Sequence, residues 1–199
     1  MTRFADLPVE FVGSFPDPAH RLSPVLPEIA FFGRSNVGKS SLINAVVGRR
    51  IARTSGTPGK TQHLNVFRFP TFYLIDLPGY GYAKLSLTER RRLQALVHDT
   101  IVGRTDLAAV VWLLDIRHPP SSIDLAMRDL LADARREAIV VLTKADKLSR
   151  VKRAAAARSR AAELEIDPDD LVISSSTTGL GLDDLRDLVL EAVGGPPLP

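Results

Sequence analysis

Cysteine is absent from the 199-residue sequence, which excludes disulfide bonds and thiolate metal sites. No apolar run is long enough to cross a membrane, and the longest one, residues 107–114, has the length of a buried strand. The first residues, MTRFADLPVEF, contain neither a basic leader nor an apolar signal core. These absences predict a cytoplasmic protein without a membrane partner, and the lack of cysteine fits a reducing compartment.

Acidic residues are missing from one long stretch of the chain, positions 29–75. The same stretch contains the basic residues Arg34, Lys39, Arg49, Arg50, Arg53, Lys60 and Arg68. The net charge of the whole chain is only +3, which is too small by itself to establish a polyanionic partner. The local imbalance, in contrast, indicates that an anionic group lies against this stretch.

Predicted strands and helices alternate along the chain, which favours an α/β fold with a mainly parallel, six-stranded sheet and helices on both faces. We expect strands at 28–32, 63–69, 72–75, 107–114, 138–142 and 171–173, and helices at 39–47, 93–101, 123–134, 151–164 and 182–192. The proline-rich residues 1–27 are expected to form an extended N-terminal extension with one early strand. One domain covers residues 28–194, and residues 195–199 form a flexible tail. In such sheets ligands bind at the carboxyl ends of the strands.

The segment FFGRSNVGKSSLIN, residues 31–44, contains the phosphate-loop pattern Gly33-x-x-x-x-Gly38-Lys39-Ser40. Glycines let the backbone curl so that successive N–H groups point at phosphate oxygens, and the following helix adds its positive N-terminal end. Lys39 would reach the β- and γ-phosphates, and the Ser40 hydroxyl would bind Mg²⁺. The alternative is an ordinary glycine turn with a solvated lysine, but the position between a strand and a helix favours the phosphate loop.

Two further segments follow predicted strands. In Asp76-Leu77-Pro78-Gly79, the aspartate can hold Mg²⁺ through water and the glycine N–H can reach the γ-phosphate; alone, the segment would be a turn. In Thr143-Lys144-Ala145-Asp146, the carboxylate can accept two hydrogen bonds from guanine, whereas adenine would present a lone pair to it. The alternative is a surface lysine–aspartate pair. Residues 174–176, three serines, lie where backbone N–H groups could meet the guanine O6, or form only a turn or helix cap.

These segments, in this order, resemble the Ras-like (TRAFAC) P-loop GTPase superfamily, and more closely the EngB family (also called YsxC or YihA), bacterial GTPases of large-subunit ribosome assembly. The resemblance lies in PEIAFFGRSNVGKSSLIN, ARTSGTPGKTQHLN, DLPGYGYAK and TKADK, and it covers about residues 27–193. It implies a single Ras-like GTPase domain that binds GTP or GDP with Mg²⁺. It also implies that residues 59–63 form the first switch and residues 76–84 the second.

The resemblance assigns roles residue by residue. Thr61 would be the switch threonine that completes the coordination of Mg²⁺, so the metal set is Ser40, Thr61 and Asp76, and the catalytic set is Lys39, Thr61 and Gly79. The expected nucleotide-binding residues are Gly33, Arg34, Ser35, Asn36, Val37, Gly38, Lys39, Ser40, Ser41, Gly59, Lys60, Thr61, Gln62, His63, Asp76, Leu77, Pro78, Gly79, Thr143, Lys144, Ala145, Asp146, Ser174, Ser175 and Ser176.

The sequence departs from the superfamily at several of these positions. Thr143 replaces the common asparagine, and the three serines replace the general Ser-Ala-Lys pattern. Tyr80 follows Gly79 where Ras proteins have a water-orienting glutamine, and we expect it to pack rather than to catalyse, so that intrinsic GTP hydrolysis is slow and a partner accelerates it. Asn36 stands where some related GTPases coordinate potassium; the alternative for Asn36 is a loop hydrogen bond.

Two clusters of basic residues give information about the kind of partner that the protein binds. Residues 147–160, KLSRVKRAAAARSR, contain no acid, and three arginines occupy 90–92. Such clusters bind phosphate backbones or form a solvated helix face. The resemblance points to ribosomal RNA and the large subunit. The alternatives are a GTPase with another partner, in tRNA modification or cell division, and a GTP-binding module with negligible hydrolysis. No segment resembles a coiled coil, and we expect a monomer.

Overall fold

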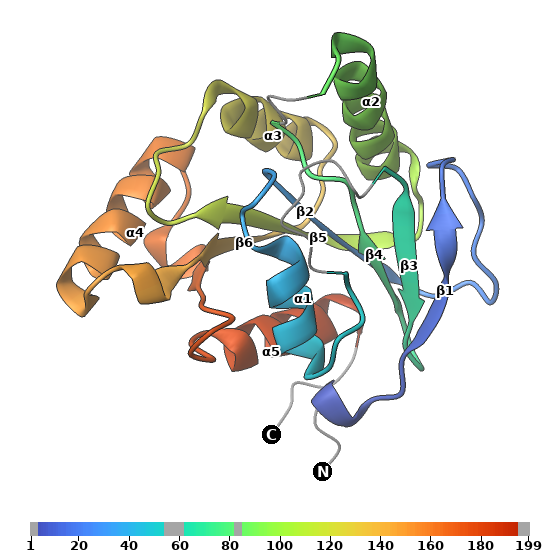
Figure 1. Ribbon diagram of the computed structural model, residues 1–199, viewed down its shortest axis with the longest axis horizontal. Coiled ribbons are helices and arrows are strands. Elements are labelled where there is room, and N and C mark those ends of the chain that lie inside the picture. Colours follow the sequence, from blue (N-terminus) through green and yellow to red (C-terminus); the bar gives the residue numbers. More distant parts are fainter. Residues whose placement is uncertain (1–3, 54–61, 82–84, 195–199) are drawn as a thin grey trace.

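The structure, a computed structural model, describes residues 4–53, 62–81 and 85–194 and is built around one seven-stranded sheet (Figure 1). The strand order is β1-β3-β4-β2-β5-β6-β7. Neighbours from β4 to β7 pair in parallel, whereas β3 pairs antiparallel with both β1 and β4. The strands are β1 (Glu10–Phe15), β2 (Glu28–Gly33), β3 (Leu64–Arg68), β4 (Tyr73–Asp76), β5 (Leu107–Asp115), β6 (Ala138–Thr143) and β7 (Leu171–Ile173).

Helices cover both faces of the sheet, and a separate apolar core lies under each set (Figure 1). Residues of α1 and α5, such as Ile43 and Val189, pack in one core, and residues of α2, α3 and α4, such as Leu96, Leu131 and Ala161, pack in the other. The helices are α1 (Lys39–Val47), α2 (Leu87–Gly103), α3 (Ser122–Asp133), α4 (Arg150–Leu164) and α5 (Leu182–Ala192), with short 3-10 helices η1 (Phe4–Asp6), η2 (Ala145–Lys147) and η3 (Pro168–Asp170). Because both faces are covered, β2 and β5 are almost continuously apolar.

The predicted fold class, an α/β sheet that is mainly parallel with helices on both faces, is confirmed. The structure has a seventh strand, β1, which comes from the proline-rich N-terminal extension and pairs with β3 at the sheet edge. Helix α2 begins at Leu87, earlier than the apolar periodicity predicts, because Ser86 and Glu89 form a capping box that starts the helix. Among the described residues, no helix is long and apolar enough to cross a membrane.

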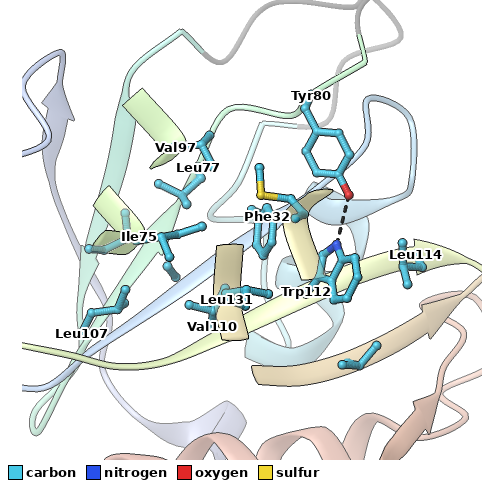
Figure 2. Packing of buried hydrophobic residues seen from close by; sticks show 14 of the residues in the cluster. Phe32, Ile75, Leu77, Tyr80, Val97, Leu107, Val110, Trp112, Leu114 and Leu131 are labelled. Carbon is cyan, nitrogen blue, oxygen red and sulfur yellow. Dashed lines mark hydrogen bonds between the residues drawn. The ribbon is translucent and has the colours of Figure 1, made fainter. Parts of the chain in front are cut away.

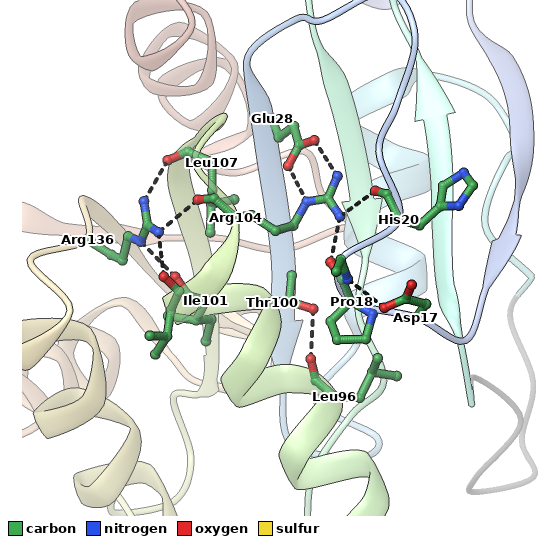
Figure 3. A network of polar contacts seen from close by, with 12 residues as sticks. Asp17, Pro18, His20, Glu28, Leu96, Thr100, Ile101, Arg104, Leu107 and Arg136 are labelled. Carbon is green, nitrogen blue, oxygen red and sulfur yellow. Dashed lines mark hydrogen bonds and ion pairs between the residues drawn. The ribbon is translucent and has the colours of Figure 1, made fainter.

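The N-terminal extension is held to the sheet by Arg104, at the C-terminal end of α2 (Figure 3). The guanidinium donates to both carboxylate oxygens of Glu28 at 2.5 Å, and its Nη1 donates to the carbonyls of Pro18 (2.8 Å) and His20 (3.0 Å). Arg104 and Glu28 are both buried. Through the bidentate pair and the two Nη1 bonds, the Arg104 side chain joins the extension, the first residue of β2 and the end of α2.

Replacing Arg104 with methionine is expected to lower the free energy of unfolding by about 3–5 kcal/mol, because the buried Glu28 carboxylate loses its counter-charge. Urea unfolding measures the change. The double variant Glu28→Leu with Arg104→Met, which removes both charges, should recover part of the loss. A loss below about 1 kcal/mol in the single variant, the range of an exposed ion pair, would contradict this account.

Candidate functional site

The four predicted motifs lie at the carboxyl ends of four strands of the sheet. Gly33 ends β2, Asp76 ends β4, Thr143 ends β6 and Ile173 ends β7, just before the three serines. Because β4 and β2 are neighbours and β6 and β7 are neighbours, the parallel sheet brings segments far apart in sequence to one edge. This edge is where ligands bind in open α/β sheets.

The loop between β2 and α1 has the backbone that a phosphate cradle requires. Gly38 immediately precedes α1 with φ = 101°, and Asn36 has φ = 63°, a left-handed conformation that asparagine tolerates better than most residues. A Cβ atom on Gly33 would lie 2.6 Å from the Leu113 carbonyl oxygen, so only glycine lets β2 pass β5 at this point. The loop ends at the N-terminus of α1, whose free N–H groups favour an anion.

The second motif contacts this loop through both side chain and backbone. The Lys39 ammonium forms an ion pair with the Asp76 carboxylate, and both groups are buried. The Tyr80 N–H donates to the Gly33 carbonyl at 3.2 Å, and the Ser35 N–H donates to the Tyr80 carbonyl at 2.8 Å. The segment that follows β4 is therefore fixed against the phosphate loop.

Tyr80 packs in the apolar core that lies under α2, α3 and α4, as predicted (Figure 2). Its hydroxyl donates to the Asp124 carboxylate at 2.7 Å and accepts from the Trp112 indole N–H at 3.0 Å. Burial first, and then the Asp124 carboxylate, raise the pKa of the Tyr80 hydroxyl well above its ordinary value, so it remains a donor. Both hydrogen-bonding roles of the Tyr80 hydroxyl are therefore taken by core partners.

The third motif is bonded to the outer part of the phosphate loop. The Thr143 hydroxyl lies 2.7 Å from the Val37 carbonyl oxygen and donates to it, and the Lys144 ammonium donates to the Asn36 carbonyl at 2.5 Å. Lys144 also pairs with Asp115 at 3.0 Å. Thr143 therefore makes a loop contact of its own at the position where the superfamily has asparagine.

Asp146 presents a carboxylate beside the serine segment. It accepts from the Ser175 hydroxyl at 2.8 Å and pairs with the Lys147 ammonium at 3.0 Å. The hydrogen bond from Ser175, and next that from Lys147, hold the pKa of Asp146 below its usual value, so the group is anionic at neutral pH. A cavity of about 190 Å³ lies here, and its lining includes Val37, Gly38, Ser41, Thr143, Lys144, Asp146, Lys147 and Ser176. Its size and its carboxylate suit a purine base.

The structure brings most of the predicted residues to this edge. Ser174 and Ser175 are buried, and the Ala145 N–H donates to the Ser174 carbonyl at 3.0 Å, which joins the third and fourth motifs. Leu77, Pro78 and Gly79 are buried next to Asp76, and Arg34 and Ser35 lie in the phosphate loop. Gly59, Lys60 and Thr61 lie outside the described residues, and Gln62 and His63 directly precede β3.

Asn44 is a contributor that the sequence prediction missed. Its side chain donates to the Ala52 carbonyl at 2.9 Å and accepts from the N–H groups of Ile51 (2.9 Å) and Ala52 (2.8 Å). It thereby holds the chain that leaves α1 against that helix, just before the first predicted switch. An asparagine among apolar residues inside a helix was the available signal, because such a side chain needs partners when it is partly buried.

The donors present suit magnesium. Ser40 is in the first turn of α1, and Asp76 ends β4, which lies next to β2, the strand that precedes α1. Mg²⁺ usually binds through one or two protein oxygens together with water and substrate phosphates. Within the described ranges no group of three or more His, Cys, Asp or Glu side chains is placed to hold a metal, so the protein offers a partial set that a bound phosphate would complete.

Comparison with known sequences identifies close relatives. A family model described as "50S ribosome-binding GTPase" matches residues 28–144. A probable GTP-binding protein EngB of Trichlorobacter lovleyi is 44% identical over 188 residues, which is 92% of this chain and 94% of the relative. The corresponding protein of Heliobacterium modesticaldum is 46% identical over 167 residues, 82% of each chain.

Solved structures show the same fold. A crystal structure of a probable GTP-binding protein EngB superposes with a TM-score of 0.71 and 23% identity, covering 84% of this chain and 98% of the other. Aquifex aeolicus Era bound to GDP and AlF4⁻ superposes with a TM-score of 0.69 and 21% identity, over 87% of this chain and 58% of Era. With the family model, the relatives and the fold in agreement, the chain belongs to the EngB family of GTP-binding proteins and is a GTPase.

Proposed function

We propose that this GTPase is a nucleotide-dependent switch with slow intrinsic hydrolysis that acts in assembly of the large ribosomal subunit, in the cytoplasm and as a monomer. The observation that carries the proposal is the joining of the phosphate loop to the predicted base pocket. Thr143 and Lys144 bond directly to carbonyls of the loop. A nucleotide bound across the phosphate loop and the base pocket would therefore contact loops that are bonded to one another.

In this proposal residues 28–194 form the unit that binds the nucleotide. Backbone N–H groups of the phosphate loop and Lys39 hold the phosphates, and Asp146 accepts hydrogen bonds from the base. Ser40, Thr61 and Asp76 would hold Mg²⁺, which neutralises phosphate charge when bound. Lys39, Thr61 and Gly79 are the residues that we propose contact the γ-phosphate or its metal.

Slow hydrolysis is supported by the position of Tyr80. Its hydroxyl is buried and bonded to Asp124 and Trp112, so the residue after Gly79 offers no group to orient the attacking water. Hydrolysis also requires stabilisation of charge on the transferred phosphate, which in related enzymes a cation supplies. The exposed Asn36 is our candidate for holding a potassium ion in that role, and a ribosomal partner is the candidate for ordering the switches.

The ribosomal partner is supported by the description of the family model and by exposed basic residues. Arg150, Lys152 and Arg158 are exposed on α4, and Arg91 and Arg92 are exposed on α2 directly after the second predicted switch. Lys and Arg side chains arranged along a helix neutralise phosphates and release counterions.

Co-sedimentation with purified large subunits tests this function. The protein with a non-hydrolysable GTP analogue is expected to pellet with the subunit at low salt and to be released as salt rises from about 50 to 200 mM, since the contacts are with phosphates. The GDP form should pellet less, because the switches differ between the two states. Small subunits serve as the control particle. Failure to pellet at low salt with either nucleotide would contradict the ribosomal partner.

The same Tyr80 geometry favours very slow hydrolysis in the absence of a partner. Single-turnover GTP hydrolysis with and without large subunits tests this. The switch requires faster turnover with subunits, and equal turnover under both conditions would contradict it.

A further inference from the structure

A second and larger cavity lies next to the phosphate loop and is not the predicted base pocket. Its volume is about 500 Å³. It is lined by residues 34–37, by parts of the connection from β5 to α3, and by Asp124, Lys144 and Arg160. We call it the lateral pocket. Of the residues that line the base pocket, only Val37 and Lys144 also line this one, so these two residues form a wall between the cavities.

Cations outnumber anions in the lining of the lateral pocket. Arg34, Arg117, Lys144 and Arg160 face two carboxylates, Asp115 and Asp124. The Asp115 carboxylate is shared, because Arg117 donates to it at 2.9 and 2.7 Å and Lys144 lies 3.0 Å away. Arg160 also pairs with Glu163 at 2.9 Å, outside the lining, so the four cations and their three carboxylate partners keep an excess of one positive charge.

Two of the guanidinium groups retain unused donors. Arg34 Nη1 lies 3.8 Å from Asp124 Oδ2, beyond hydrogen-bond distance, and that oxygen already accepts from the Ser121 N–H and hydroxyl at 2.7 Å. Arg160 donates through Nη2 to Ser159 and Glu163, but its buried Nε has no partner among the described residues. An unpaired buried donor is costly, and a planar guanidinium matches the oxygens of a phosphate group.

We propose that the lateral pocket binds a phosphodiester group of an RNA partner. This inference rests on the proposed ribosomal function. RNA fits better than an acidic protein because Arg160 is on α4, which also carries the exposed Lys152 about two turns nearer its N-terminus. Pro119 and Pro120 add an apolar side to the pocket that suits a ribose or base, and the volume exceeds what a lone phosphate needs.

Binding of a ligand in the lateral pocket is expected to alter contacts at the nucleotide site. Lys144 donates to the Asn36 carbonyl and lines both cavities, and Asp124 accepts from the Tyr80 hydroxyl within the second predicted switch. Trp112, the single tryptophan, donates to the same Tyr80 hydroxyl. We therefore expect the fluorescence of Trp112 to change when the hydrogen bond between Tyr80 and Asp124 changes.

The test uses the full chain saturated with GDP and Mg²⁺, so that the phosphate loop is filled, and a labelled oligouridylate of about 12 nucleotides as the probe. RNA is expected to bind and to change Trp112 fluorescence. Replacing Arg160 with methionine should weaken binding about tenfold and lower the slope of log affinity against log salt by about 0.7, the value for one single-strand phosphate contact. Arg160→Lys should restore part of the affinity. Arg117→Met is a second variant in case Arg160→Met fails to fold.

The matched control is Arg158→Met, which removes an exposed arginine of the same helix outside the pocket. It should keep the fluorescence change, which Arg160→Met should lose. Equal effects of the two variants would place RNA on the helix face and overturn the proposal. Inorganic phosphate that reproduces the full fluorescence change and is not displaced by RNA would also overturn it, and so would a polyglutamate peptide that binds in preference to RNA.

Pelleting separates this inference from the proposed function. If the wild type pellets with large subunits and Arg160→Met pellets equally well, the lateral-pocket proposal fails and the ribosomal function stands. If the wild type does not pellet but oligouridylate binding still depends on Arg160, the site stands and the ribosomal function fails.

Discussion

Replacing Lys39 with alanine is expected to abolish measurable binding of GTP and GDP. The variant would lack the charge-assisted hydrogen bonds from the Lys39 ammonium to two phosphates. Each bond contributes about 1.5–3 kcal/mol, which corresponds to a loss of about 100- to 10,000-fold in affinity for the two together. Isothermal titration with GDP in the presence of Mg²⁺ measures the change. Lys152→Ala, an exposed lysine of α4, is the control and should bind as the wild type does.

The same substitution also affects folding, because the Asp76 carboxylate would be left buried without its ion pair. Breaking a buried pair by removing one partner costs about 3–5 kcal/mol. The double variant Lys39→Ala with Asp76→Asn removes that unpaired charge and should regain stability while binding stays lost. A folded Lys39→Ala protein whose GDP affinity is within about threefold of the wild type would show that Lys39 does not hold the phosphates.

Replacing Asp146 with asparagine is expected to reverse the base preference from guanine to xanthine. The carboxylate is held anionic by Ser175 and Lys147, and guanine can donate two hydrogen bonds to it. Its loss should weaken GTP binding by about 100- to 1,000-fold, because charge-assisted bonds are replaced by an amide that faces a donor. The amide can instead donate to the extra oxygen of xanthine, so XTP should become the better ligand.

Competition of GTP, XTP and ATP against a labelled nucleotide measures this preference. Asp170→Asn, an exposed carboxylate in η3, provides the matched control and should leave the preference for GTP unchanged. An Asp146→Asn protein that still prefers GTP would refute the assigned base contact. Ser175 can continue to donate to the amide oxygen, so the new side chain should keep the orientation of the carboxylate.

Helices and strands whose boundaries are set by neighbouring residues could be predicted from the sequence, whereas those that depend on distant residues could not. The helix at residues 39–47 and the strand at 171–173 agree with the structure to the residue, because an apolar pattern and flanking turn residues define both. The start of α2 depended on the Ser86–Glu89 capping box, a local signal that the apolar pattern does not contain. β1 could be expected only as one early strand, because its pairing with β3 joins residues more than 45 positions apart, such as Phe15 and Leu64.

The same distinction between local and distant causes holds for the candidate site. The motifs themselves, and their order along the chain, are local patterns that indicate a phosphate loop and a guanine contact. The bonds between motifs are not local. Lys144 reaches the Asn36 carbonyl over 108 positions in sequence, and no spacing rule predicts that contact. The contacts of Arg104 were missed for the same reason, since its partners lie 76 to 86 positions away in the sequence.

The sequence by itself determined the alternation of strands and helices, the order of the nucleotide-binding motifs and the likeness to one family, because each depends on residues close together in the chain. Only the tertiary structure decided that Lys39 pairs with Asp76, that the Tyr80 hydroxyl is bonded inside the core, and that a cationic pocket lies beside the phosphate loop. These features depend on the packing of distant strands and helices, and a buried charge or hydroxyl takes its partner from whatever that packing places next to it.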